Sequence, residues 1–423
     1  MSEFGTTADS SRPPRAAGMA FILVAVLIDM ISIGLIIPVL PPLVGTFTAS
    51  QADHAFWFGA VAFSFGIANF FGSPILGALS DHFGRRPVML IGFCGLALSF
   101  FVTALATALW MLIAVRLFSG AMQANTAVAN AYVADISAPH ERAKRFGMLG
   151  AAFGLGFMLG PVVGGLLGAI DLHLPFYVAG GLSVINLCYG YFVLPESLRP
   201  EHRRRFDWRS ANPVSALKRL GNLKGVGPLM LVVGLSSMAQ LVLHTSWVLY
   251  THFKFGWGPL ENGLSLFVIG SMAVLVQGFL LPRLLKLFSP QRLVVLGLIS
   301  STIANFFWGV ASSGWMMYAV IGFNLLGFAA NAAIQSLIAN AADPSTQGET
   351  MGAVASLNSL MAVMAPIVGA GLLGLVSGLP RGDWRIGAPF YFCALLQALA
   401  LHFAWRHFKR ARLVPATPAS SFN

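Results

Sequence analysis

The stretch Gly-Ala-Leu-Ser-Asp-His-Phe-Gly-Arg-Arg-Pro, residues 77–87, separates two long apolar segments near residues 55–79 and 88–106. So tight a connection makes the two segments antiparallel neighbours. Its two arginines are what a loop on the cytoplasmic side of a membrane protein commonly carries. An acid at the very end of a spanning segment, Asp81, is not explained by that rule, and it indicates a role beyond topology.

The composition places the chain in a lipid bilayer. Apolar residues make up 57% of the 423 residues and charged residues only 10%, whereas a soluble domain is about 25% charged. The net charge of +11 comes from short loops, where topology and anionic lipid head groups account for it, so we expect no nucleic-acid partner. The cysteines lie inside apolar segments and are expected to be small buried side chains, not disulfides: Cys94, Cys188 and Cys393.

Twelve apolar segments are long enough to span a bilayer, which takes about 20 residues. An all-α membrane protein with both ends on one side is therefore predicted. If both termini lie in the cytoplasm, all of the 26 Lys and Arg residues fall in cytoplasmic segments except Lys254, Arg381, Arg385 and the membrane-embedded Arg116. We therefore predict an inner-membrane protein with cytoplasmic termini. The segments are 18–42, 55–79, 88–106, 109–132, 146–169, 174–195, 226–250, 260–284, 291–311, 314–340, 350–378 and 387–408.

The two halves of the chain repeat. Parallel repeats are an architecture of secondary transporters, with the substrate site between the halves near the midplane. Matching residues lie 205 to 208 positions apart: Gly120 and Gly327, Asp135 and Asp343, Pro161 and Pro366. We expect two pseudo-symmetric six-helix bundles, 18–195 and 226–408, joined by a basic cytoplasmic linker at 196–225, with a disordered N-terminal tail at 1–17 and a C-terminal tail at 409–423.

Asp29 and Arg116 are the only acid and the only base deep in the predicted spans. Charges inside a bilayer are costly and are usually functional. The depths of the two residues differ by roughly a few Å at a rise of about 1.5 Å per residue, so an ion pair is feasible. Two interpretations stay open. One is a salt bridge that only fixes helix packing, and the other is a proton-coupling pair in which Asp29 loads and releases a proton while Arg116 competes with the proton for the carboxylate or biases its pKa.

Neutral polar side chains recur in helices of both halves. A single one is most often interhelical glue, but so many predict a wet central cavity that suits a bulky, partly apolar ligand. One of them, His244, is either a second protonatable group or a structural residue. The predicted lining is Asn69, Gln123, Asn130, Gln240, His244, Trp247, Gln277, Asn324, Asn331, Gln335 and Asn358.

Glycines recur at four-residue spacing in the fifth segment. Such spacing lets helix backbones approach closely and slide, and a proline among them should bend the helix. Close packing alone and a bending or sliding contact are both compatible with this pattern. The residues that define it are Gly156, Gly160, Pro161, Gly164 and Gly165.

These motifs resemble those of the major facilitator superfamily over the whole chain. Residues 77–87 resemble its loop between helices 2 and 3, and residues 116–120 resemble its helix-4 motif, whose arginine is associated with proton coupling. Residues 156–165 resemble the helix-5 motif of its antiporters. The resemblance implies the twelve-helix major facilitator fold, with two six-helix bundles.

Within that superfamily the chain is similar to the tetracycline exporters of the twelve-helix drug:proton antiporter family. The similar stretches are residues 27–41, 108–112 and 255–257. Such exporters carry further membrane acids where this chain has Ser99 and Ser301, so the role of Asp29 becomes more important here. The positions that match functional residues of that group are Asp29, Asn69, Asp81, Arg85 and Arg116.

The resemblance implies a proton-coupled antiporter that exports amphipathic drugs, tetracycline-like or multidrug, by alternating access. Its expected partners are a drug-like small molecule, protons and membrane lipids; we expect a monomer with no cofactor, metal site or catalytic residue. An uptake symporter and a non-transporting receptor or scaffold are the alternatives. The glycine-proline motif disfavours the symporter, and the lone membrane acid disfavours the receptor or scaffold. The absence of a Gly-x-x-x-x-Gly-Lys-Ser/Thr phosphate loop disfavours an ATP-driven pump.

The charged stretch is then expected to act as a conformational latch that stabilises the outward-facing state. Arg85 should pair with Asp135 at the end of helix 4. Asp81 should face the start of helix 11, where Thr346 and Glu349 have capping-box spacing and the helix N-terminus carries partial positive charge. The full predicted latch is Gly77, Asp81, Gly84, Arg85, Arg86 and Asp135.

Overall fold

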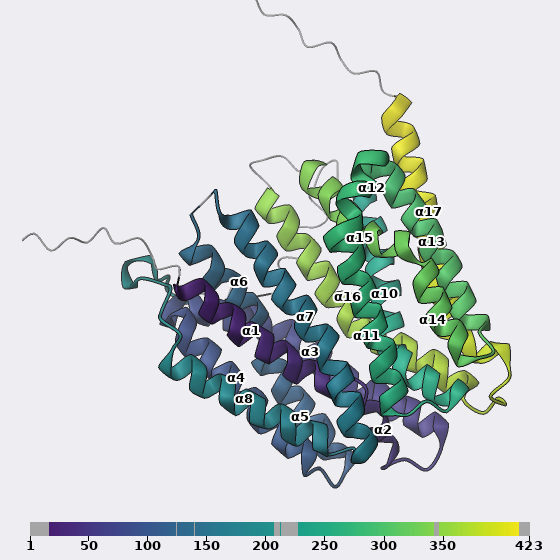
Figure 1. Cartoon of the computed structure of the whole chain (residues 1–423), viewed down its shortest axis with the longest axis horizontal. Helices are drawn as coiled ribbons and strands as arrows, with labels where there is room; N and C mark the ends of the chain where they lie inside the picture. The colour runs from purple at the N-terminus through teal and green to yellow at the C-terminus, as the bar shows by residue number, and fades with distance from the viewer. Residues whose placement is uncertain are drawn as a thin grey trace, which may run out of the picture.

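The protein is helical throughout the part that the structure describes. The computed structural model describes residues 17–123, 125–138, 140–206, 212, 227–341 and 347–413, and no strand occurs within them. In these ranges nine helices are long and apolar enough to cross a membrane, and one bent pair makes a tenth. The remaining two crossings are a broken helix and a shorter helix of the first bundle, so the helices form the two expected six-helix bundles (Figure 1).

The first bundle holds the first six crossings. A first crossing in two pieces, α1 and α2, is followed by α3 and α4, by a fourth crossing in two pieces, α5 and α6, and by α7 and α8. The bounds are α1 (Ala17–Ile36), α2 (Leu40–Gly45), α3 (Gln51–Phe83), α4 (Arg85–Ala104), α5 (Leu109–Met122), α6 (Asn125–Ile136), α7 (Arg142–Ile170) and α8 (Leu174–Phe192).

The second bundle repeats this order. Its second crossing contains a π-helical turn, and its fourth is a pair bent by 50°. The bounds are α10 (Gly227–Phe255), α11 (Pro259–Leu275), η2 (Val276–Leu280), α12 (Leu281–Leu287), α13 (Pro290–Val310), α14 (Gly314–Phe323), α15 (Leu325–Ala341), α16 (Gln347–Val376) and α17 (Ala388–Leu413), with short 3-10 turns η1 (Pro200–His202) and η3 (Trp384–Gly387).

Two predicted spans of the first bundle are broken where we expected continuous helices. The first span ends at Ile36 and resumes at Leu40, because Pro38 lacks the N–H that a helix needs and its ring obstructs the preceding turn. The fourth span is interrupted at Gln123, whose ψ of 64° is not helical. Both breaks lie next to the central cavity described below, where discontinuous helices commonly form binding sites in transporters.

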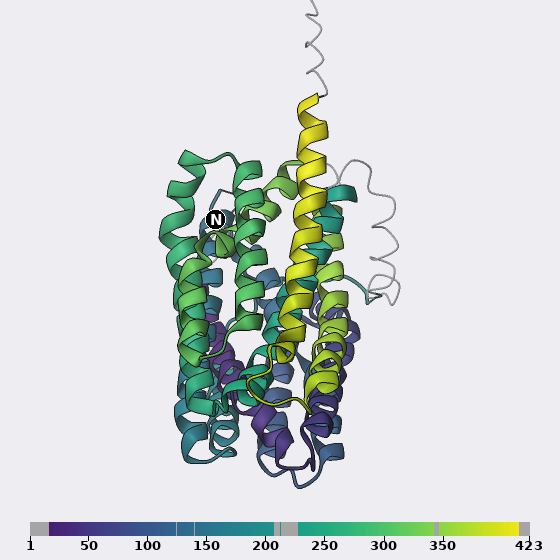
Figure 2. The ribbon, with the colours of Figure 1, turned by 90° about the vertical axis from the view of Figure 1, so that its right-hand side faces the viewer.

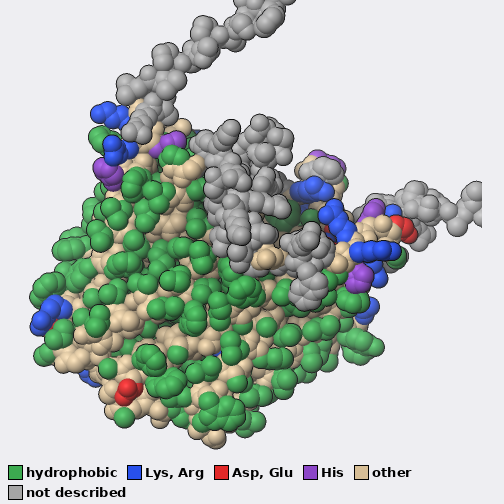
Figure 3. All heavy atoms as spheres, turned by 180° about the vertical axis from the view of Figure 1, so that it is seen from behind, with side chains coloured by type: hydrophobic (Ala, Val, Ile, Leu, Met, Phe, Trp, Pro, Cys, Tyr) green, Lys and Arg blue, Asp and Glu red, His purple; other side chains and the backbone are tan. Residues whose placement is uncertain are grey.

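The two ends of the bundle differ in charge. One end, which we call the basic end, carries the α3–α4 turn, the start of α1 and the end of α17 (Figures 1 and 2). Lys and Arg side chains gather there, while hydrophobic side chains cover the middle of the face seen in Figure 3. The other end, with the α2–α3 and α7–α8 turns, is called the opposite end.

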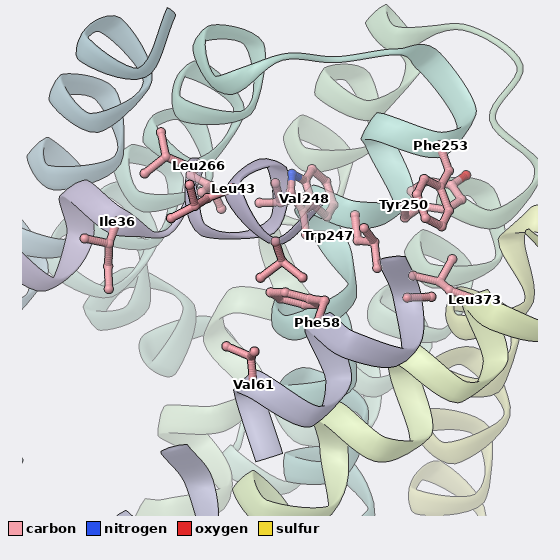
Figure 4. Close-up of a cluster of buried hydrophobic side chains, with 14 of the residues drawn as sticks. Ile36, Leu43, Phe58, Val61, Trp247, Val248, Tyr250, Phe253, Leu266 and Leu373 are labelled. Carbon is pink, nitrogen blue, oxygen red and sulfur yellow. The ribbon is translucent and has the colours of Figure 1, made fainter. Parts of the chain in front are cut away.

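The bundles are packed together at the opposite end. A single hydrophobic cluster there contains buried residues from both, including Ile36, Leu43 and Phe58 of the first bundle and Trp247 and Leu373 of the second (Figure 4). Contacts between α3 and α16 and between α7 and α11 continue this interface. Burial of large side chains from both bundles closes this end of the molecule.

Toward the basic end the bundles separate. The buried residues there form two clusters, one within the first bundle, between Met19 and Leu194, and one within the second, between Leu229 and Ala404. A Cβ added at Gly150 of α7 or at Gly278 of η2 would meet no described atom within 4 Å beyond its own helix. Figure 1 shows the same arrangement, because the bundles converge near α2 and diverge toward the basic end.

The cysteine expectation is right for one residue and wrong for two. Cys393 is buried, whereas Cys94 and Cys188 are exposed on the outer faces of α4 and α8. A membrane helix presents apolar side chains to lipid as well as to the core, so an apolar segment does not by itself indicate which face is buried.

Candidate functional site

A cavity of about 410 Å³ lies between the two bundles, directly beside the hydrophobic cluster of the opposite end. Helices of both bundles line it, mostly with aliphatic and aromatic side chains. Among the predicted residues, Asn69, Gln123, His244 and Arg116 line this central cavity. The volume and lining suit a drug-sized, partly apolar ligand.

A second, smaller cavity of about 270 Å³ lies within the second bundle, and we call it the side cavity. It shares His244 and Phe157 with the central cavity, so the two are adjoining. Trp247 is held in its wall by a hydrogen bond from Nε1 to Ser265 Oγ at 2.9 Å. Further predicted residues that line it are Gln240, Gln277 and Asn324.

Four predicted lining residues are outside both cavities or outside the described side chains. Asn130 donates from Nδ2 to Thr126 O at 2.9 Å along its own helix. Asn358 accepts from Ser237 Oγ at 2.6 Å, which ties α16 to α10. Gln335 is exposed, and the side chain of Asn331 is not among those described. The helical pattern cannot distinguish a cavity face from an interhelical hydrogen bond, so it groups these residues with the lining.

Asp29 is buried in α1, and its partner is Asn125 at the start of α6. Asn125 Nδ2 donates to Asp29 Oδ1 at 3.3 Å. The ion pair with Arg116 that we considered feasible is not formed within the described residues: the Nε and Nη2 atoms of Arg116 are buried and have no hydrogen-bond partner there. The break between α5 and α6 separates the two sites, because Arg116 precedes it and Asn125 follows it.

Broken helices occur at the same place in both bundles. In the first, Gln123 ends α5 and lines the central cavity. In the second, Asn324 ends α14, accepts from Ser300 Oγ at 2.9 Å and lines the side cavity. Each break frees backbone groups at cavity depth, where a water-filled or polar surface can satisfy them. The chain repeat thus extends to the irregular segments that border the cavities.

The glycine motif of α7 packs on two different helices. Gly160 lies against Gly34 of α1, where an added Cβ would be 2.6 Å from the Gly34 Cα. Gly156 and Gly164 also face α1. Gly165 faces α11 of the other bundle, with an added Cβ 2.6 Å from Pro259 O. The helix α7 therefore connects the helix that carries Asp29 to the interface between the bundles.

Arg85 begins α4 and binds three oxygen acceptors. Its Nη1 lies 2.6 Å from Asp81 Oδ1 and donates to Ser80 Oγ at 2.6 Å, and its Nε donates to Asp135 Oδ2 at 3.0 Å. The Arg85–Asp135 pair expected from the sequence is thus present. In this conformation the charges of the turn are satisfied within the first bundle.

Glu196, to which the sequence assigned no role, caps α4. Its Oε1 accepts from the backbone N of Arg85 at 2.9 Å, and its Oε2 from the backbone N of Arg86 at 3.2 Å. An anion is favoured at a helix N-terminus because four N–H groups there lack helical partners. Gly84, with φ of 111°, leaves room for this carboxylate. Glu196 lies over one hundred residues downstream, so local spacing gave no signal for it.

The rest of the predicted latch has fewer contacts. Arg86 donates from Nη2 to Tyr191 O, and a Cβ added at Gly77 would meet nothing within 4 Å. The backbone N of Arg204 donates to Asp81 O at 3.0 Å, so the linker touches the turn. Thr346 and the side chain of Glu349 lie outside the described part of the chain, and the contact of Asp81 with helix 11 stays a prediction.

A third hollow, of about 1210 Å³, lies beside this turn between α1 and the linker. Its lining mixes acids and bases, and Arg85 pairs there with both Asp81 and Asp135. A ligand there would compete with those pairs, so the central cavity is the better candidate for a drug site.

Two acids in loops outside the membrane, Asp171 and Asp383, have a lowered pKa. A hydrogen bond from the His173 backbone holds the pKa of Asp171 below its ordinary value. Hydrogen bonds from the Arg385 side chain and backbone do the same for the pKa of Asp383. These loop carboxylates therefore do not take up protons in the range in which a transport cycle operates.

Comparison with known proteins shows the family. A family model described as Major Facilitator Superfamily matches residues 22–366. Tetracycline resistance protein, class C, of Escherichia coli is 34% identical over 377 residues, which cover 88% of this chain and 94% of that protein. Multidrug resistance protein 2 of Bacillus subtilis is 27% identical over 394 residues, 91% of this chain and 94% of that protein.

The fold of a solved transporter also matches. A bacterial homolog of the human lysosomal transporter Spinster, solved in an inward-facing and unoccupied conformation, has a TM-score of 0.75 at 15% identity, and the match covers 96% of this chain and 100% of that one. The family model, the relative at 34% identity and the two six-helix bundles agree. This multi-pass membrane protein belongs to the Major Facilitator Superfamily.

Proposed function

We propose that the protein is a proton-coupled antiporter that exports amphipathic drugs across the bacterial inner membrane. The observation that carries the proposal is the pairing of a drug-sized central cavity with one buried carboxylate, Asp29, on a helix packed against the α7 glycine motif. Relatives named for tetracycline resistance and multidrug resistance support drug export as its direction.

The basic end is assigned to the cytoplasm. The excess of Lys and Arg at this end supports that orientation. With it, the structure represents an inward-facing state, since the bundles are closed at the opposite end and separate toward the cytoplasm. A drug then enters the central cavity from the cytoplasm or the inner leaflet.

The transport cycle moves two bundles, proposed as 18–195 and 226–408, around the cavity. Asp29 takes up a proton in one state and releases it in the other, while Asn125 Nδ2, which donates to Oδ1, holds the carboxyl group in place. Because α7 touches α1 on one face and α11 on the other, a shift of α1 on protonation reaches the interface between the bundles. The turn at residues 77–87 holds the first bundle together on the cytoplasmic side.

A drug-susceptibility panel in an efflux-deficient host tests this proposal. The wild-type protein should raise the inhibitory concentration of at least one amphipathic drug, and Asp29→Asn should abolish that resistance at equal expression. In proteoliposomes an imposed pH gradient should drive drug in the direction opposite to proton flow. Movement of drug and protons in the same direction would identify an uptake symporter, and no flux of any compound in the panel would identify a receptor or scaffold.

A further inference from the structure

Arg116 is a buried cation without a partner for two of its nitrogens among the described residues. The residue is 6% exposed, and its buried Nε and Nη2 atoms donate to no described acceptor. No described carboxylate forms an ion pair with it, and Asp29 is hydrogen-bonded to Asn125 instead. An unpaired guanidinium in a membrane interior is costly, so its free N–H donors indicate a site for a ligand.

The described lining of the two cavities carries no acidic side chain. Among the described residues that line the central cavity, Arg116 carries the only full charge, and His244 is the only other titratable side chain. The described lining of the side cavity contains no Asp, Glu, Lys or Arg. A permanently cationic ligand would therefore meet a cation and no anion in either cavity.

The side cavity is built for an uncharged polar end of a ligand. Asn305, 4% exposed, donates from Nδ2 to Ser301 O at 2.8 Å, and its Oδ1 has no donor among the described groups. Trp247 and Trp308 line the same cavity, and their ring centroids lie 5.4 Å apart. An aromatic body with a hydroxyl or amide group would satisfy the open acceptor and stack on these rings.

We infer that the substrate is an organic anion: a carboxylate, sulfonate or phenolate on an apolar aromatic body. The guanidinium of Arg116 binds the anionic group, since its planar fork matches two oxygens of such a group. The aromatic body fills the central cavity, and its uncharged end reaches the side cavity past His244. This inference rests on the proposed transport function and narrows its substrate class.

Two dyes with one ring system test the charge preference. Fluorescein is an anion and rhodamine 123 a cation on the same xanthene frame, so they differ chiefly in charge. Binding of each to the purified full-length protein in detergent is measured by fluorescence polarisation at pH 8. The wild-type protein should bind fluorescein at least about tenfold more tightly than rhodamine 123.

Variants at the same cation separate charge from shape. Arg116→Gln should lower fluorescein affinity by about tenfold or more and leave rhodamine 123 affinity within about twofold. Arg116→Lys keeps the charge but loses the fork, so it should retain part of the preference. Arg283→Gln removes an exposed arginine of α12 and should change neither affinity. The wild-type preference needs no variant, so it tests the inference even if Arg116→Gln misfolds.

Three results would overturn the inference: rhodamine 123 bound as tightly as fluorescein, an unchanged preference in Arg116→Gln, or no binding of fluorescein at millimolar concentration. Failure of the transport proposal looks different. If rhodamine 123 binds better and a pH gradient expels it, the exporter stands and the anion preference falls. If fluorescein binds with the stated preference but no gradient moves it, the anion site stands and the transport proposal falls.

Discussion

The carboxylate of Asp29 in α1 is bound by Asn125 from the start of α6, with 3.3 Å between Oδ1 and Nδ2. Gly92 of α4 lies on the other side of Asn125, and a Cβ at this position would collide with Asn125 Oδ1. Three helices of one bundle thus fix the orientation of the amide. The buried acid is positioned by a neutral group, so it can be charged or protonated without breaking an ion pair.

Asp29→Asn should uncouple transport from the proton gradient. The amide has nearly the shape of the carboxylic acid but carries no exchangeable charge, so drug binding should stay within about threefold of wild type while pH-gradient-driven flux is lost. Flux in proteoliposomes and dye binding are the two measurements. Asp53→Asn, an exposed acid at the start of α3, is the matched control and should behave as wild type. Full gradient-driven flux in Asp29→Asn would refute the coupling role.

Gly92→Ala should impair coupling by displacing Asn125. The methyl group has no room beside Asn125 Oδ1, so the amide must turn away from Asp29, and overpacking costs about 1–3 kcal/mol. We expect gradient-driven flux to fall about tenfold or more, with a lower thermal midpoint. Gly181→Ala in α8 is the control, because a Cβ there meets nothing within 4 Å. Equal flux in the two variants would show that Asn125 does not position Asp29.

The sequence predicted the membrane fold and the Arg85–Asp135 pair because both follow from local patterns. The length of the apolar segments indicates the spans. A basic loop and an acid at a later helix end on the same side of the membrane together indicate an ion pair. The feasible ion pair of Asp29 and Arg116 is absent from the described residues, since depth along two helices does not tell which way each side chain faces. The break at Gln123, which turns Asn125 toward Asp29, has no proline to announce it.

The sequence also did not predict the contact of Glu196, or which of the polar side chains line a cavity. The contact of Glu196 with the start of α4 depends on how the end of α8 approaches the α3–α4 turn, which is a tertiary relationship. Asn358 and Asn69 have the same character in the sequence, yet one bonds to Ser237 and the other lines the cavity. Only packing distinguishes the two uses.

A disulfide across the opposite end should lock the transporter. A Cβ at Gly374 in α16 would lie 3.8 Å from the Cβ of Ala55 in α3, close to the usual separation of about 3.8 Å in disulfides. In a protein without its native cysteines, Ala55→Cys with Gly374→Cys should cross-link on oxidation and abolish flux, and a reductant should restore it. Each single cysteine variant is the control. A cross-linked protein that still transports would show that this end need not open.

Glu196→Gln should weaken the α3–α4 turn without touching the cavity. The substitution replaces a charged acceptor at the α4 N-terminus with a neutral one, and helix-terminus charges contribute about 0.3–1 kcal/mol at exposed sites. A small drop in thermal midpoint, measured by a thermal-shift assay, is therefore expected, with unchanged dye binding. A midpoint equal to that of wild type would show that the charge of Glu196 does not stabilise α4.

Asp81→Asn should have the larger effect on transport. It removes the charge that faces Arg85 Nη1 at 2.6 Å, and we propose that the same charge meets the start of α16 when the cytoplasmic side closes. Flux should fall strongly while dye affinity stays near wild type, and the Ala55→Cys/Gly374→Cys pair should cross-link faster, because more of the protein rests inward-facing. Glu201→Gln, in the same hollow, is the control for a lost negative charge. Weak dye binding with an unchanged cross-linking rate in Asp81→Asn would place Asp81 in ligand binding and not in the closing of the cytoplasmic side.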